Sequence, residues 1–138
     1  MRVVLDTNIL LSALINPHGS PAKLIDAWRS GRFQLVTSQQ QLTELGSVAR
    51  REVLRKYVVP SRVGRFINDL RALAHVVERL PPVDRSRDPA DNFLLAMAET
   101  VEAEYLVTGD KRDVLVLQHH GSTRIVTPRE LLSALRIE

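Results

Sequence analysis

The composition is that of an ordinary globular protein, and it excludes several kinds of chemistry. The chain has 138 residues, 44% hydrophobic and 25% charged, so we expect one domain over residues 1–138. Cysteine is absent, which excludes disulfides, thiolate nucleophiles and cysteine-based metal sites. The formal net charge of +3 and the pI near 9.8 favour a polyanionic partner. No stretch resembles a secretory signal or a membrane span, so we expect a cytoplasmic protein.

Strand patterns recur along the whole chain. Short stretches rich in β-branched residues predict strands at 2–5, 33–37, 105–108 and 123–126, with a weaker candidate at 76–77. Helical patterns separate these strands. Short apolar strands that alternate with helices form parallel sheets covered on both faces. The sequence therefore predicts an α/β sandwich.

Capping residues predict where the helices begin. Three helix starts combine a side-chain acceptor with a proline at the first helical position: Ser20-Pro21, Asp88-Pro89 and Thr127-Pro128. Ser38 and Gln41 predict a capping box for another helix, and a further helix is expected to open at Ser61. Gly31 is expected to close the first of the proline-started helices. The polar segment 81–88 is predicted to be a long loop.

Five acidic residues lie at predicted strand ends or on core-facing positions. Asp6 and Asp110 directly follow strands, and parallel strands place such residues at the same edge of the sheet. Asp113 lies one turn further on, where we expect another helix. Asp91 projects onto the apolar side of its helix, and Glu44 lies at the edge of an apolar stripe. All five acids are therefore candidates for one site.

Each acid also has a structural interpretation. Asp91 lies in a first helical turn, where a carboxylate stabilises the helix dipole. Asp110 could be a turn residue, Asp113 a solvated helix-terminal acid and Glu44 a surface residue. Asp6 is harder to explain structurally, because a carboxylate beside a central strand loses solvation.

Taken together, these acids predict a metal site. Carboxylates that converge at one edge repel one another, and a divalent cation with a preference for oxygen ligands relieves the repulsion. Mg²⁺ or Mn²⁺ suits a chain without cysteine whose four histidines have no metal-binding spacing. Such ions activate water for attack on phosphoryl groups. Metal-dependent phosphodiester hydrolysis is the resulting hypothesis, and no GxSxG, GxxxxGKS/T or GxGxxG motif supports another chemistry.

The sequence resembles the PIN-domain ribonucleases, in particular the VapC-like toxins of prokaryotic toxin-antitoxin pairs. The resemblance lies in four blocks in order: VVLDTNILLSAL, TSQQQLTELGSVARREVL, RDPADNFLLAMA and EYLVTGDKRDVLVL, followed by IVTPRELL. It implies a three-layer α/β/α sandwich with a central parallel sheet of about five strands.

The resemblance also implies roles for individual residues. Asp6, Glu44, Asp91 and Asp110 match the four acids of the catalytic metal site, and Asp113 matches an accessory acid that varies in position. Thr7 and Asn8 match polar neighbours that orient the first acid. Asp88 matches a position that is often acidic, although its place before Pro89 favours a helix cap.

The implied activity is endonucleolytic cleavage of RNA with Mg²⁺ or Mn²⁺, by a homodimer that a small antitoxin inhibits. The RNA-binding residues are not identified by the motifs. Arginine-rich helices between residues 50 and 71 could bind the RNA backbone or could simply be solvated: Arg50, Arg51, Arg55, Lys56, Arg62, Arg65 and Arg71.

Two other functions compete with this hypothesis. A PIN fold that binds RNA or a protein without catalysis would be expected to lack one of the four acids, and all four are present. A phosphatase with Asp6 as covalent nucleophile would need a second aspartate where Asn8 stands.

Overall fold

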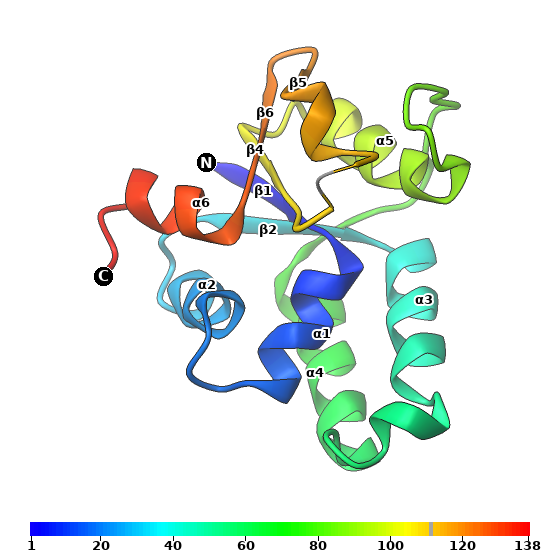
Figure 1. The fold of residues 1–138 in the computed structure, drawn as a ribbon, viewed down its shortest axis with the longest axis vertical. Coiled ribbons are helices and arrows are strands. Elements are labelled where there is room, and N and C mark those ends of the chain that lie inside the picture. Colours follow the sequence, from blue (N-terminus) through cyan, green and yellow to red (C-terminus); the bar gives the residue numbers. More distant parts are fainter. Residues whose placement is uncertain (111) are drawn as a thin grey trace.

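A six-stranded sheet lies at the centre of the computed structural model, which describes residues 1–110 and 112–138 (Figure 1). Its strands are β1 (Arg2–Leu5), β2 (Gln34–Ser38), β3 (His75–Val77), β4 (Tyr105–Val107), β5 (His119–His120) and β6 (Thr123–Val126). Their order across the sheet is β3-β2-β1-β4-β6-β5. All neighbouring pairs are parallel except β5 and β6, which are antiparallel. The predicted parallel sheet of about five strands is confirmed, and β5 is an additional edge strand.

Helices cover both faces of the sheet, as Figure 1 shows. The α-helices are α1 (Thr7–Ile15), α2 (Ser20–Arg29), α3 (Gln39–Ala49), α4 (Pro60–Leu73), α5 (Asn92–Val101) and α6 (Pro128–Ala134). Three short 3-10 helices are η1 (Glu52–Leu54), η2 (Pro89–Asp91) and η3 (Leu115–Leu117). Helix α5 packs on one face and the other α-helices on the opposite face, so the predicted sandwich is confirmed. No helix in the described part of the chain is long and apolar enough to cross a membrane.

The central strand β1 is buried on both faces. Val3 and Leu5 belong to the core cluster formed with α1, α2, α3, α4 and α6, whereas Val4 belongs to the cluster formed with α5. Successive side chains of a strand point to opposite faces, which accounts for this division. The chain therefore leaves a fully buried strand at Leu5 and enters α1 at once, with Asp6 between them.

The predicted helix starts are partly confirmed. Thr127 forms a full capping box with Glu130 at the start of α6, and Gly31 follows α2 with a φ of 80°. Ser20 does not cap α2, because the cap position belongs to Gly19 and the helix already includes Ser20. Helix α4 likewise begins at Pro60, one residue before the predicted Ser61.

Two local predictions differ from the structure. Ser38 Oγ accepts a hydrogen bond from the Gln41 backbone N–H at 3.2 Å, but the Gln41 side chain bonds elsewhere, so half of the capping box forms. No α-helix follows Asp113: the described residues there form turns and η3, which lead into the β5–β6 hairpin. Asp110 stabilises the turn instead, because its Oδ1 accepts from the backbone N–H groups of Arg112 and Asp113, both at 3.1 Å.

Candidate metal centre

Asp6 is fixed at the carboxyl end of β1 by bonds to its own helix and to β4. Its backbone N–H donates to the carbonyl of Val107 at 2.9 Å. Its Oδ1 accepts from the Asn8 backbone N–H at 3.1 Å, and its Oδ2 accepts from the Thr108 hydroxyl at 2.7 Å. Burial raises the pKa of Asp6 above its ordinary value, although these donors oppose the shift. The two hydrogen-bond donors thus fix the orientation of the Asp6 carboxylate, but they only partly offset the unfavourable effect of burial on its negative charge.

Thr108 is a site residue that the sequence analysis missed. Its side chain is fully buried, and its hydroxyl both donates to Asp6 and accepts from the Asp110 backbone N–H at 3.0 Å. It therefore links the two acids that follow β1 and β4. The available signal was a hydroxyl residue at the end of a strand, directly before Gly109 and Asp110.

Glu44 lies in the second turn of α3, within electrostatic reach of Asp6. It is half-buried, and burial followed by the negative charge of Asp6 raises its pKa. The charge of Arg51 acts in the opposite direction and lowers it. Glu44 thus lies within electrostatic reach of both the first acid and a cation beyond the end of α3.

Asp91, the last residue of η2, carries the strongest electrostatic signature. Burial, together with the charges of Asp6, Asp88 and Asp110, raises its pKa to about 7. Its ordinary value is 3.8. Such a shift arises where carboxylates crowd together without compensating cations, and it is typical of functional sites.

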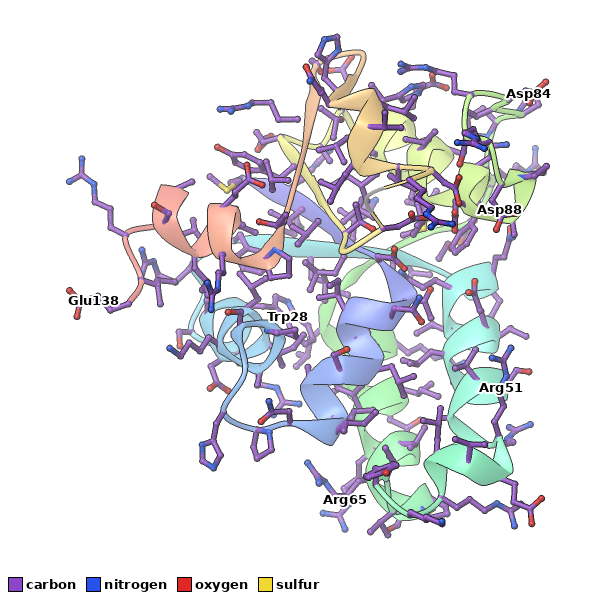
Figure 2. The ribbon with its side chains drawn as sticks, viewed as in Figure 1. Trp28, Arg51, Arg65, Asp84, Asp88 and Glu138 are labelled. Atoms are coloured by element: carbon purple, nitrogen blue, oxygen red, sulfur yellow. The ribbon has the colours of Figure 1, made fainter. Side chains whose placement is uncertain are left out.

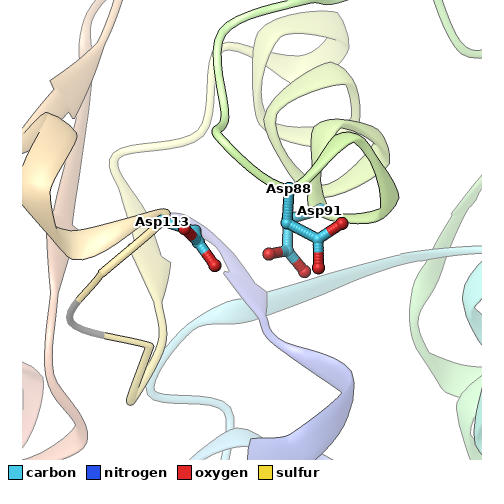
Figure 3. Close-up of side chains that lie close together, drawn as sticks. All are labelled: Asp88, Asp91 and Asp113. Carbon is cyan, nitrogen blue, oxygen red and sulfur yellow. The ribbon is translucent and has the colours of Figure 1, made fainter.

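Three aspartates approach one another most closely. One carboxylate oxygen from each of Asp88, Asp91 and Asp113 lies within 4.8 Å of the other two. In Figure 3, Asp88 and Asp91 project side by side from η2 and its cap, and Asp113 points toward them from the segment after β4. Asp88 also caps η2, because its Oδ1 accepts from the Ala90 backbone N–H at 3.0 Å. The cap predicted for Asp88 is present, and the same carboxylate joins the acidic group.

Asn92, the second residue that the sequence analysis missed, shapes the loop beside these aspartates. Its side chain is buried, and its Oδ1 accepts from the backbone N–H groups of Arg85 and Ser86, at 3.1 and 2.9 Å. Ser86 Oγ then donates to the carbonyl of Asp113 at 3.1 Å. These bonds connect the loop that carries Asp88 to the segment that carries Asp113.

The two residues expected to orient Asp6 lie next to it but act differently from each other. Asn8 contributes its backbone N–H, while the residue as a whole is exposed. Thr7 is 2% exposed, and its Oγ1 is buried without a hydrogen-bond partner among the described residues. An unpaired buried hydroxyl is unusual in native proteins.

The donor set fits a hard divalent cation. All the acids offer oxygen ligands, the type that Mg²⁺ and Mn²⁺ bind. Among the described residues the ion pairs are Arg29–Asp69 and His120–Glu99, and neither includes an acid of the site. Of the four acids expected to hold a metal, Asp91 alone belongs to the close group with Asp88 and Asp113. The charges of Asp6 and Asp110 raise the pKa of Asp91, and the charge of Asp6 raises the pKa of Glu44. A cation there would relieve the repulsion that raises these pKa values.

The fold and the site together define an α/β sandwich whose mostly parallel sheet carries a group of acids at its carboxyl edge. Sequence comparison identifies the family. A family model described as PIN domain matches residues 2–112. The chain therefore belongs to the PIN-domain family.

Two individual proteins are similar over almost their whole lengths. An uncharacterized protein of Methanocaldococcus jannaschii, MJ1680, is 28% identical over 141 residues, which cover 96% of this chain and 90% of that protein. The crystal structure of PAE2754 from Pyrobaculum aerophilum matches with a TM-score of 0.64 at 20% identity, over 99% of this chain and 90% of that one. The second likeness concerns the fold alone.

Proposed function

We propose that this protein is a metal-dependent endoribonuclease that hydrolyses RNA phosphodiester bonds with Mg²⁺ or Mn²⁺. The observation that carries the proposal is the acidic group at the carboxyl edge of the sheet, in which one carboxylate oxygen from each of Asp88, Asp91 and Asp113 lies within 4.8 Å of the other two. The raised pKa of Asp91, about 7, supports it. Membership of the PIN-domain family supports a nuclease. Crowded carboxylates at the strand ends of this fold are suited to a divalent cation and poorly suited to binding RNA directly, because they repel phosphates.

The residues of the site would have different roles, some as metal ligands and others in positioning those ligands. Asp6, Glu44, Asp91 and Asp110 would hold the cation, with Asp113 as a further ligand. A bound Mg²⁺ or Mn²⁺ supplies charge stabilisation at the phosphoryl oxygens and lowers the pKa of water. Thr108 and the Asn8 backbone N–H keep the Asp6 carboxylate in one orientation. Thr7 places in the same turn a hydroxyl that has no hydrogen-bond partner within the part of the chain that the structure describes.

The direct test is cleavage of a labelled single-stranded RNA with Mn²⁺ by purified variants. Asp6→Asn and Asp91→Asn remove one ligand charge each with little change in shape, and we expect cleavage to fall at least 100-fold. Asp26→Asn, an exposed residue of α2, is the matched control and should cleave at the wild-type rate. Wild-type cleavage by the Asp6→Asn, Asp91→Asn double variant would contradict the proposal.

A non-catalytic binding module is the alternative, and metal binding separates the two. Titration of Mn²⁺ into the wild-type protein should give saturable binding that Asp6→Asn weakens. Absence of binding at millimolar Mn²⁺ would favour the binding module instead.

The resemblance to VapC-like toxins extends the proposal to partners. We expect a cytoplasmic homodimer whose site a small antitoxin protein covers. A short neighbouring reading frame that encodes a DNA-binding protein, together with co-purification of the two products, would support this role. Monomeric behaviour in sedimentation, with no such frame, would leave RNA processing as the biological role.

A further inference from the structure

The connection between α3 and α4 forms a cationic surface that the acids of the site do not neutralise. Residues 50–65 include six of the 19 Lys and Arg residues of the chain and one acid, Glu52. None of these cations belongs to either of the ion pairs found among the described residues. We call the following exposed set the hairpin tip: Arg50, Arg51, Arg55, Lys56, Tyr57 and Arg62.

Tyr57 distinguishes the hairpin tip from an ordinary solvated helix end. The chain has six aromatic residues, one Trp, two Tyr and three Phe. Tyr57 is 61% exposed, whereas the Trp and the three Phe side chains are all buried. An exposed aromatic ring among guanidinium groups is the arrangement that stacks on bases and pairs with phosphates of single-stranded nucleic acid.

The hairpin tip is also connected to the acidic site. Arg51 follows Glu44 by about two helical turns, just past the C-terminal end of the helix that carries Glu44. Figure 2 shows Asp88 above the N-terminal end of α3 and Arg51 beside the lower, C-terminal half of this helix, both on the right-hand side of the view. A strand bound at the acids can therefore continue along α3 toward the hairpin tip.

A hollow of about 360 Å³ lies beside these cations. Arg50 and Arg55 line it together with apolar residues of α3 and α4. At Gly64, one of the lining residues, a side-chain Cβ would have no neighbour within 4 Å among residues 1–110 and 112–138. The hollow is large enough to admit the base of one nucleotide, with the adjacent backbone phosphates against the two arginines.

We propose that the hairpin tip binds a single-stranded RNA segment that flanks the scissile phosphate. This inference rests on the proposed ribonuclease function and assigns the residues that hold its substrate. Arg55 and Lys56 lie between the exposed apolar residues Val53 and Tyr57, and the exposed Val59 follows Tyr57 after the buried Val58. An interleaved surface of this kind suits RNA better than an apolar protein partner.

The test measures RNA affinity without metal, so that it does not depend on cleavage. A fluorescent single-stranded RNA is titrated with protein in EDTA at several salt concentrations. Tyr57→Ala should weaken binding about tenfold, whereas Tyr57→Phe should bind like wild type. Arg55→Ser with Arg62→Ser should lower the slope of log affinity against log salt by roughly 0.7 for each lost phosphate contact. Arg129→Ser, an exposed residue of α6, is the control with an unchanged slope.

The outcomes separate this inference from the proposed function. Equal RNA affinity of wild type, Tyr57→Ala and the double arginine variant would overturn the inference, as would stronger binding of duplex than of single-stranded RNA. Circular dichroism of each variant shows whether it is folded, and Gly64→Leu, which fills the hollow without a change of charge, should also weaken binding. Hydrolysis of bis(p-nitrophenyl) phosphate by wild type with Mn²⁺ tests the acidic site alone, because this diester carries no flanking nucleotides.

Discussion

The hydrogen bond from Thr108 lowers the pKa of Asp6 and so opposes the larger, upward effect of burial. The carboxylate is buried, so desolvation favours its neutral form, and the hydroxyl at 2.7 Å favours the ionised form. The same hydroxyl accepts from the Asp110 N–H. Removal of that hydroxyl therefore affects two acids of the site.

We predict that Thr108→Val destabilises the protein by about 1–3 kcal/mol at pH 8, because it leaves buried polar groups without partners. The loss should be smaller at pH 4, where Asp6 is closer to its neutral form and depends less on a donor. Thr108→Ser keeps the hydroxyl and should follow the pH profile of wild type. Urea unfolding at both pH values measures the effect, and a pH-independent loss in Thr108→Val would contradict this role.

Asp91 makes the metal-free protein sensitive to pH. Its pKa is raised to about 7 from 3.8, so the folded state binds more protons than the unfolded state between these values. Stability should therefore be greatest at the acidic end of this window and fall as pH rises toward about 7. The raised pKa values of Asp6 and Glu44 act in the same direction.

We predict that Asp91→Asn raises the melting temperature in EDTA at pH 8 and flattens the decline between pH 4 and pH 7. The amide is neutral at every pH, so the repulsion from Asp6, Asp88 and Asp110 no longer develops. Thermal melts over this range measure the effect, with Asp26→Asn as the exposed control. A variant that melts below wild type at pH 8 would show that repulsion does not limit stability there.

At the scale of elements, Gln41 fixes α3 against the sheet. Its side chain is fully buried, its Nε2 donates to the Leu5 carbonyl at 2.6 Å, and its Oε1 accepts from the Thr37 hydroxyl at 2.7 Å. Leu5 precedes Asp6, and Glu44 lies one turn after Gln41. One amide group thus helps to position both Asp6, at the end of β1, and Glu44, on α3.

We predict that Gln41→Met destabilises the protein by roughly 2–4 kcal/mol, because a side chain of similar size leaves the Leu5 carbonyl and the Thr37 hydroxyl without partners. Gln39→Met, an exposed neighbour on the same helix, should change stability by less than about 0.5 kcal/mol. Urea unfolding gives both values. Equal stability of the two variants would mean that water or another group replaces the amide.

The sequence predicted the elements better than it predicted the bonds between them. Short β-branched runs identify β1 and β6 with their observed bounds, because buried parallel strands need this composition. Thr108 and Asn92 were missed as site residues, and Gln41 was predicted only as part of a capping box, since polar side chains acquire their roles from partners that only the fold brings close. The Thr108–Asp6 bond, for example, spans 102 residues of sequence.

The segment after β4 shows the same limit. A helix was expected after Asp113, because a carboxylate often precedes one. The carboxylate of Asp110 instead accepts from the backbone two and three residues later, and the two-residue strand β5 pairs antiparallel with β6. Short turns of this kind leave little periodicity to detect.

At the scale of the whole molecule, negative and positive side chains gather in two different regions. The carboxyl edge of the sheet gathers acids that repel phosphate, and the hairpin tip gathers cations that attract it. The net charge of +3 therefore conceals two regions of opposite sign. A cation at the acidic edge is needed before a polyanion can approach it closely.

The acids of that edge come from separate parts of the fold: the end of β1, α3, η2 and the segment after β4. A divalent ion that joins them should therefore stabilise the molecule as a whole, since the unfolded chain does not bring these groups together.

We predict that saturating Mn²⁺ raises the melting temperature by several degrees at pH 8, because a ligand at 100 times its Kd adds about 2.7 kcal/mol. At pH 5 the rise should be much smaller, since Asp91 with its pKa of about 7 must first release a proton. Asp6→Asn should diminish the Mn²⁺ effect at pH 8, and Asp26→Asn should preserve it. A rise of equal size in Asp6→Asn would place the cation outside the acidic edge.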